Sequence, residues 1–230
     1  MRHSSSRRRS LSGLWVAFVA LAGPAAYAHA ANSGDPSAVT IAQQGDGHGT
    51  PPCSSCHGQA GEGLATAGYP RLAGLPAAYL LAQLNALADG TRQNPVMGPL
   101  ARGMSQQERS QLASYYASLP PHATAHAGAT VTTGLADDRL ALHGRWSDEI
   151  PACVQCHGTG GSGVGSTFPA LTGQPSLYIA NQLRAWKQGT RRGEPLGLMQ
   201  AIATRLSEAD IRAVSDYFAA QPLPKSGAKP

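Results

Sequence analysis

All four cysteines of the chain lie in two copies of one short motif, and each copy ends in a histidine. The copies are Cys53-Ser-Ser-Cys56-His57 and Cys153-Val-Gln-Cys156-His157. A Cys-x-x-Cys pair alone is compatible with a thiol redox pair, half of a zinc site or a small disulfide. A histidine directly after the second cysteine is the pattern of covalent c-type haem attachment, in which the thiols bind the porphyrin and the imidazole reaches its iron.

The spacing of the two motifs helps to separate these alternatives. A zinc ribbon needs its cysteine pairs about 15 to 20 residues apart, whereas Cys53 and Cys153 are 100 positions apart. A thioredoxin-like redox protein needs strands alternating with helices, and no alternating apolar pattern here predicts a sheet. We therefore predict two covalently bound haem c groups, with thiol attachment and imidazole ligation by Cys53, Cys56, His57, Cys153, Cys156 and His157.

The chain is an internal repeat, and each copy carries one motif. The segment 72–92 (LAGLPAAYLLAQLNALADGTR) matches 171–191 (LTGQPSLYIANQLRAWKQGTR), including a Tyr, a Gln-Leu pair and a final Gly-Thr-Arg. Self-similarity at a fixed offset indicates a duplicated unit. We predict one domain at 37–120 and a second at 135–222, joined by a linker at 121–134 that is rich in Pro, Ala, Thr, His and Gly.

The second axial ligand of each iron decides between electron transfer and catalysis. An iron with His and Met as its two axial ligands has no open coordination position, whereas an iron with an exchangeable axial position can bind a substrate. Met97 and Met199 each lie eight residues before a serine, Ser105 and Ser207, that opens the last helix. The repeat therefore aligns the two methionines, and we predict that both bind iron from irregular stretches. Four histidines without a counterpart in the other copy are expected at the surface: His48, His122, His126 and His143.

Helical periodicity predicts an all-α fold. Apolar residues within the repeated segment recur at helical spacing, and Gly90 and Gly189 are expected to end these helices. Ser105 and Ser207 are each followed three residues later by an acid, as in a capping box, and predict a final helix in each copy. A short helix is also expected before each motif, more clearly at 136–143 than at 38–44.

The N-terminus has the composition of an export signal. Four of the 18 basic residues lie in the first nine positions, uncharged residues follow at 11–23, and small residues surround Ala28 and Ala30. This apolar stretch is shorter than the roughly 20 residues of a membrane span. We predict a secretory signal peptide at 1–28 and a periplasmic protein. Because the leader carries most of the net charge of +5, the composition does not favour nucleic-acid binding.

Large apolar side chains are scarce in this sequence. Leu, Ile, Val and Phe together make up fewer than a fifth of the residues, and charged residues make up 13%. A folded chain with so few of them needs another component at its centre, such as a cofactor. A porphyrin in each copy would supply much of that core.

Each copy resembles a class I cytochrome c, and the tandem arrangement resembles the dihaem cytochrome c4 family. The matching features are Cys-x-x-Cys-His-Gly, the Tyr-Pro-x-Leu-x-Gly run at 69–74 with its partner at 168–173, the Gln-Leu helices and the Met before the last helix. The resemblance implies two small helical haem domains that face each other across a pseudo-twofold axis and shuttle electrons to terminal oxidases. It also implies that the carbonyls of Pro70 and Pro169 accept the proton of the proximal imidazole.

We therefore expect a periplasmic electron carrier and not an enzyme. Its partners would be redox proteins, with a respiratory complex or dehydrogenase as donor and a terminal oxidase as acceptor. One alternative is a dihaem enzyme of the thiosulfate dehydrogenase or peroxidase type, which needs an exchangeable position on at least one haem. Another is an electron-accepting subunit of a membrane dehydrogenase or oxidase. The matched methionines favour the carrier over the enzyme.

Two further pairs of repeated residues have alternative interpretations. Arg92 and Arg191 follow a helix-ending Gly-Thr, and we expect them to be solvated, although a guanidinium also suits a haem propionate. Tyr79 and Tyr178 are expected to be core aromatics and not electron relays.

Overall fold

A computed structural model of the protein describes residues 37–122 and 137–223. We call these ranges the N-terminal and C-terminal domains, and both lie in one compact unit that starts at Pro36. In the described ranges the chain is helical, and its extended pairings are four isolated bridges. No described helix is long and apolar enough to cross a membrane. The signal peptide expected at 1–28 and most of the linker expected at 121–134 lie outside the described residues.

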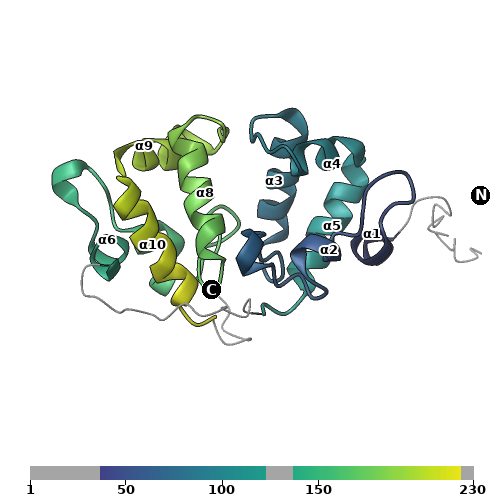
Figure 1. The fold of residues 1–230 in the computed structure, drawn as a ribbon, viewed down its shortest axis with the longest axis horizontal. Helices are drawn as coiled ribbons and strands as arrows, with labels where there is room; N and C mark the ends of the chain where they lie inside the picture. The colour runs from purple at the N-terminus through teal and green to yellow at the C-terminus, as the bar shows by residue number, and fades with distance from the viewer. Residues whose placement is uncertain (1–36, 123–136, 224–230) are drawn as a thin grey trace, which may run out of the picture. The chain divides into compact units, whose positions relative to one another are not determined.

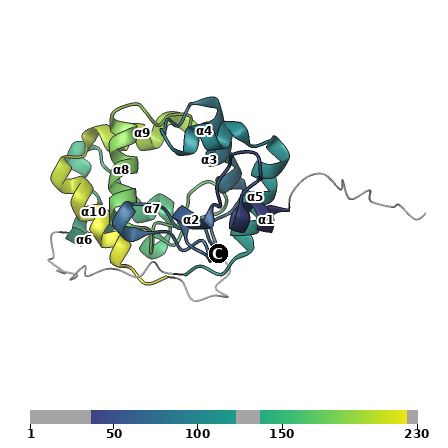
Figure 2. The same cartoon turned by 45° about the vertical axis from the view of Figure 1, so that its right-hand side comes forward.

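The helices follow the same order in the two domains (Figure 1). Those of the N-terminal domain are α1 Ala38–Gln44, α2 Ser54–His57, α3 Ala77–Asp89, α4 Met97–Gly103 and α5 Gln106–Ser118. Those of the C-terminal domain are α6 Asp137–His143, α7 Cys153–His157, α8 Ser176–Lys187, α9 Leu198–Arg205 and α10 Glu208–Ala220. The last helix packs on the first and third helices of its own domain, α5 on α1 and α3, and α10 on α6 and α8 (Figure 2). The all-α prediction is confirmed.

The predicted helix boundaries have the expected chemistry. The Ser105 side chain accepts a hydrogen bond from the backbone N–H of Glu108, and the Glu108 side chain accepts one from the N–H of Ser105. Ser207 and Asp210 form the same reciprocal pair at the start of α10. Helix α3 ends at Gly90, which adopts the left-handed conformation with φ 83°. Glycine enters this conformation without the steric cost of a Cβ.

The stretches that hold the two methionines are helical, and the expectation of irregular backbone there was wrong. Met97 is the first residue of α4 and Met199 is the second residue of α9. The Asn94 side chain accepts hydrogen bonds from the N–H groups of Val96 and Met97 at 3.0 and 2.8 Å, which satisfies donors that open the helix. Pro99 falls in the first turn, where its missing N–H removes no intrahelical bond.

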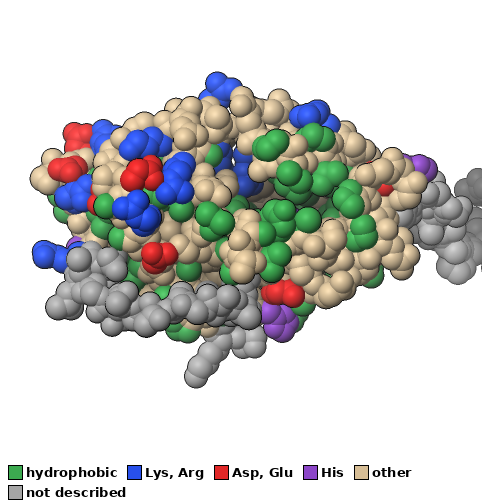
Figure 3. All heavy atoms as spheres, viewed as in Figure 1, with side chains coloured by type: hydrophobic (Ala, Val, Ile, Leu, Met, Phe, Trp, Pro, Cys, Tyr) green, Lys and Arg blue, Asp and Glu red, His purple; other side chains and the backbone are tan. Residues whose placement is uncertain are grey.

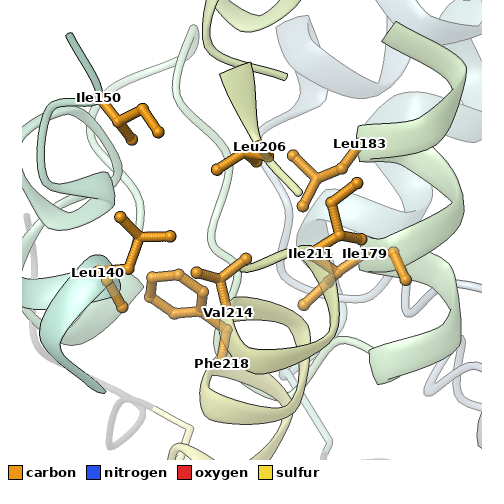
Figure 4. Close-up of a cluster of buried hydrophobic side chains, with 10 residues drawn as sticks. Leu140, Ile150, Ile179, Leu183, Leu206, Ile211, Val214 and Phe218 are labelled. Carbon is orange, nitrogen blue, oxygen red and sulfur yellow. The ribbon is translucent and has the colours of Figure 1, made fainter. Parts of the chain in front are cut away.

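Each domain has its own apolar core beside its motif. The C-terminal core gathers side chains from α6, α8 and α10 and from the segments before α7 and after α9 (Figure 4). They include Leu140, Ile150, Ile179, Leu183, Leu206, Ile211, Val214 and Phe218. The N-terminal core includes Ile41, Leu80, Met104, Leu112 and Tyr116. Met104, at 5% exposure, and Leu206, at 4%, occupy equivalent places before the last helix, which is the position of a hydrophobic staple.

A bidentate ion pair joins the start of α10 to the segment before the second motif. Arg145 donates from Nη1 and Nη2 to the two carboxylate oxygens of Asp210 at 2.8 and 2.9 Å. The hydrogen bonds from Arg145 hold the pKa of Asp210 below its ordinary value of 3.8, and those from Ser207 act in the same direction. A carboxyl group whose pKa is lower in the folded state than in the unfolded state stabilises the fold at pH values above the unfolded-state pKa. This contribution is lost progressively as the pH falls from the unfolded-state pKa toward the folded-state pKa.

We expect acid to destabilise the C-terminal domain partly through this pair. Between pH 7 and pH 3 the free energy of unfolding should fall more in the wild type than in Asp210→Asn. The difference between the two falls should be on the order of 1 kcal/mol, the usual contribution of a helix cap to stability. Denaturant titrations followed by tryptophan fluorescence measure this domain, because Trp146 and Trp186 both lie in it. Equal losses in the two proteins would contradict the assignment.

Candidate functional site

Each Cys-x-x-Cys-His motif folds into about one turn of helix. In the first motif the N–H of His57 donates to the carbonyl of Cys53 at 2.9 Å, and α2 ends at His57. The second motif forms α7 over Cys153–His157. Residues three and four positions apart lie on one face of a helical turn. The two thiols and the imidazole of each motif therefore point to the same side of the chain.

The two motif histidines are buried, and both donate to a proline carbonyl. His57 is 6% exposed and His157 is 7% exposed. The Nδ1 atom of His57 lies 2.9 Å from the Pro70 oxygen, and that of His157 lies 2.8 Å from the Pro169 oxygen. A carbonyl can only accept, so Nδ1 carries the proton and Nε2 keeps its lone pair for a metal. The proline role implied by the resemblance is confirmed in both domains.

Burial also sets the protonation of the groups in the motifs. Burial lowers the pKa of His57 and His157, which keeps both rings neutral. The charge of Arg92 lowers the pKa of His57 further. Burial raises the pKa of the Cys153 thiol to about 11 and also raises that of Cys53. No disulfide joins these four cysteines, so each thiol is available for covalent attachment.

A tight glycine loop brings each proline carbonyl back to its histidine. Gly63 has φ 87°, and its N–H donates to the carbonyl of His57 at 2.7 Å. Gly163 has φ 91° and makes the same bond to His157 at 2.6 Å. A Cβ on Gly63 would lie 2.6 Å from the backbone nitrogen of Arg71. The loop can therefore close on the motif only without a side chain at this position.

The two methionines occupy equivalent positions at the start of α4 and α9. Met97 and Met199 are both partly buried, and Met199 packs against the C-terminal core. Met104, the other methionine of the N-terminal domain, is instead part of the N-terminal core. The unmatched histidines within the described ranges, His48, His122 and His143, are exposed, and His126 lies outside those ranges.

Arg92 and Arg191 are not solvated, which corrects the expectation from the sequence. Arg191 is 5% exposed and Arg92 is partly buried. Each guanidinium reaches into the other domain, where Arg92 donates to the hydroxyl of Tyr178 at 3.1 Å and Arg191 to that of Tyr79 at 3.3 Å. The expected core role of the tyrosines holds for their rings, which pack against the domain cores. Their hydroxyls belong to this polar network.

Sequence reasoning missed two further contacts between the domains. Gln83 and Gln182 accept hydrogen bonds from both arginines, and their presence in the repeated Gln-Leu pair was the available signal. Arg71 is 1% exposed, and its backbone exchanges two hydrogen bonds with the Gln174 side chain, at 3.0 and 2.9 Å. Nothing in the repeat marks this second contact, because Ala170 and Leu75 stand at the equivalent positions.

The residues of each motif fit a covalently attached haem. Each domain offers two free thiols and a buried neutral imidazole with Nε2 available, and a proline carbonyl fixes the ring and raises its basicity. Zinc would need several such ligands at one place. In the described part of the chain no group of three or more His, Cys, Asp or Glu side chains forms such a cluster.

We expect the loop that holds the Pro70 carbonyl to be intolerant of a side chain. Gly63→Ala should lower the free energy of unfolding by about 1 to 3 kcal/mol more than Gly47→Ala, because of backbone overlap. Gly47 is a matched control, with φ 76° and no atom within 4 Å of an added Cβ. Both variants share the cost of a left-handed backbone. Chemical unfolding followed by circular dichroism tests this, and equal losses would contradict it.

Both halves of the chain match known cytochrome families. Residues 42–120 match the family described as cytochrome c, and residues 146–218 match the family described as cytochrome c oxidase, cbb3-type, subunit III. The thiosulfate dehydrogenase electron acceptor of Thiomonas intermedia is 48% identical over 171 residues, 74% of this chain and 79% of that protein. Cytochrome c4 of Pseudomonas aeruginosa is 34% identical over 175 residues, 72% of this chain and 82% of that protein.

A solved structure extends the likeness to a thiosulfate dehydrogenase. Thiosulfate dehydrogenase (TsdBA) from Marichromatium purpuratum superimposes with a TM-score of 0.76 and 42% identity, over 81% of this chain and 40% of that chain. This chain therefore spans less than half of that longer protein. Two cytochrome c domains, two Cys-x-x-Cys-His motifs and relatives of this identity lead to one conclusion: the chain belongs to the cytochrome c4 family of dihaem class I cytochromes c and carries two covalently bound haem c groups.

Proposed function

We propose that this protein is a periplasmic electron carrier that accepts single electrons from a thiosulfate dehydrogenase and passes them toward a terminal oxidase. The donor is suggested by the names of the relatives in Thiomonas intermedia and Marichromatium purpuratum. The observation that carries the proposal is the matched pair of His and Met in the two domains. Export by the signal peptide at 1–28 would place the protein in the periplasm.

We further propose the ligands and bounds of the two sites. Cys53 and Cys56 attach one haem in a domain at 37–120, with His57 and Met97 as axial ligands. The second haem is attached in a domain at 135–222 through Cys153 and Cys156, with ligands His157 and Met199. Each bound iron supplies a one-electron couple between Fe(II) and Fe(III). The protein orients the imidazole, offers the thioether and excludes water.

An enzyme built on the same fold would need an open iron position in at least one domain. The equivalence of Met97 and Met199 disfavours that alternative, because both domains offer a thioether from the same place. An assembly with the dehydrogenase is compatible with the carrier, since this chain superimposes on 40% of a solved thiosulfate dehydrogenase chain.

The ligand assignment predicts different effects for the two methionines of the N-terminal domain. Met97→Ala should open the first haem to carbon monoxide, lower its potential and halve the far-red sulfur-to-iron band of the oxidised protein. Met104→Leu should leave all three unchanged, since Met104 fills the apolar core. Spectroelectrochemistry with and without carbon monoxide measures these effects. Halving of the band in the Met104 variant alone would reverse the assignment.

Exposed apolar side chains beside the two methionines offer a docking surface for the dehydrogenase. Val96 directly precedes Met97 and is 53% exposed, and Leu196 lies three residues before Met199 and is 91% exposed. Leu196 also adopts φ 62°, an uncommon conformation for a branched side chain. On the face shown in Figure 3, hydrophobic side chains gather over the N-terminal domain, and Lys and Arg side chains gather over α9 and α10. Contact near the ligand-bearing helices would bring a partner's redox centre close to a haem.

Stopped-flow reduction tests the donor. The oxidised protein should be reduced rapidly by thiosulfate only when a purified thiosulfate dehydrogenase is present, and each molecule should take up two electrons. Leu196→Glu should slow this reduction roughly tenfold, a loss of about 1.4 kcal/mol. Val39→Glu, on α1 with 53% exposure in the wild type, is the control and should have no effect. Thiosulfate oxidation by this protein alone, or no acceleration by the dehydrogenase, would refute the proposal.

A further inference from the structure

A single peptide group connects the histidine of the first motif to the C-terminal domain. The carbonyl of Pro70 and the N–H of Arg71 belong to the same peptide bond. The carbonyl accepts from Nδ1 of His57 at 2.9 Å, and the N–H donates to the amide oxygen of Gln174 at 3.0 Å. The hydrogen bonds therefore form a continuous chain that begins at the motif histidine and ends on a side chain of the other domain.

The amide of Gln174 is held at both of its polar atoms. Its Nε2 donates to the carbonyl of Arg71 at 2.9 Å, so that the side chain and the Arg71 backbone exchange two hydrogen bonds. Gln174 is 3% exposed and Arg71 is 1% exposed, which shields these bonds from water. The reciprocal pair also fixes the orientation of the amide, because Oε1 can only accept and Nε2 can only donate.

The same peptide is restrained from two further directions. The Arg71 guanidinium donates to the carbonyl of Ala73 and, across the domains, to that of Thr172 at 3.1 Å. Within the N-terminal domain Gly63 approaches the peptide closely, since a Cβ at this position would lie 2.6 Å from the Arg71 nitrogen. The peptide between the histidine and the glutamine therefore has little freedom to turn away from either.

Hydrogen bonds that share a peptide group polarise one another. When the N–H of a peptide donates to an acceptor, the carbonyl oxygen of that peptide becomes more negative and accepts more strongly. A stronger acceptor at Nδ1 makes Nε2 of the imidazole a more basic ligand. A more basic ligand stabilises Fe(III) relative to Fe(II), so hydrogen bonding to an axial histidine lowers the reduction potential of its haem.

The repeat gives the second motif no equivalent side chain. Ala170 follows Pro169 at the place of Arg71, and Leu75 stands at the place of Gln174. Ala170 packs against the N-terminal core, of which Leu75 is a member. A leucine side chain has no atom that accepts a hydrogen bond, so it cannot polarise the peptide that follows Pro169. Among the described residues, this contribution from the opposite domain is therefore confined to the first motif.

We propose that Gln174 is a positioning residue for the first haem, which lowers the reduction potential of that haem from the other domain through the Pro70–Arg71 peptide and His57. The second haem lacks this control, so the effect changes the difference between the two potentials. The inference rests on His57 as the proposed ligand of the first haem, and it does not depend on the identity of the redox partner.

The test measures both reduction potentials of the holoprotein without a redox partner. Gln174→Leu, which copies Leu75, should raise the potential of the first haem and leave that of the second unchanged. In the reduced protein, NMR should show the Nδ1 proton of His57 exchanging with deuterium roughly tenfold faster, a change equivalent to about 1.4 kcal/mol, with no change at His157. Thr172→Val is the matched control, because it removes from the same interface a buried hydroxyl that has no hydrogen-bond partner among the described residues.

A second variant separates hydrogen bonding from packing. The carboxylate of Gln174→Glu still accepts from the N–H of Arg71, although it cannot donate to the Arg71 carbonyl. The potential of the first haem should therefore not rise, and exchange of the His57 proton should stay slow. If Gln174→Leu does not fold, Gln174→Glu decides the question, and a raised potential with rapid exchange would contradict the proposal.

Three other results would overturn the proposal. One is a change in the potential of the first haem no larger than that of the Thr172 control. Another is an equal change in both potentials, which would reflect a loosened contact between the domains. The third is an unchanged exchange rate of the His57 proton in Gln174→Leu. A His57 ring without the upfield shift caused by a bound haem would instead refute the proposed ligand assignment, and this inference with it.

Discussion

The hydrogen bond from each motif histidine to a proline carbonyl is the constraint on which the rest of each domain depends. It fixes the proton on Nδ1, leaves Nε2 free and holds a buried ring in one orientation. To make it, the chain must return to the motif within about a dozen residues. The glycine at the start of this return, Gly63 or Gly163, is therefore as necessary as the histidine. The two cores form on helices that lie both before and after this return.

Several elements could be predicted from the sequence because their causes are local. The capping boxes at Ser105 and Ser207 depend on residues three positions apart, and the motif turns depend on five consecutive residues. The start of α4 was missed because Pro99 suggested irregular backbone, although a proline in the first turn removes no hydrogen bond. The burial of Arg92 and Arg191 depends on contacts between segments that are distant in the sequence. A single sequence gives no direct signal for such contacts.

The two domains offer the same ligands in different surroundings. Trp186 stands in the C-terminal domain where Leu87 stands in the N-terminal one, and Arg71 stands where the other domain has Ala170. The charge of Arg92 reaches His57, and no corresponding effect of Arg191 acts on His157. Duplication therefore produced two motifs with the same cysteines and histidine in unequal electrostatic surroundings.

The contact between Gln174 and Arg71 ties the first domain to the second. Gln174, in the second domain, holds the backbone immediately after the Pro70 carbonyl that orients His57. The Gln174 side chain therefore helps to hold the peptide that carries the Pro70 carbonyl. Leu75, at the position equivalent to Gln174, lies in the apolar core and has no amide to offer in return. The dependence is mutual, because the Arg71 guanidinium donates in turn to the carbonyl of Thr172 in the second domain at 3.1 Å. Separation of the two domains would therefore leave buried polar groups of both without partners.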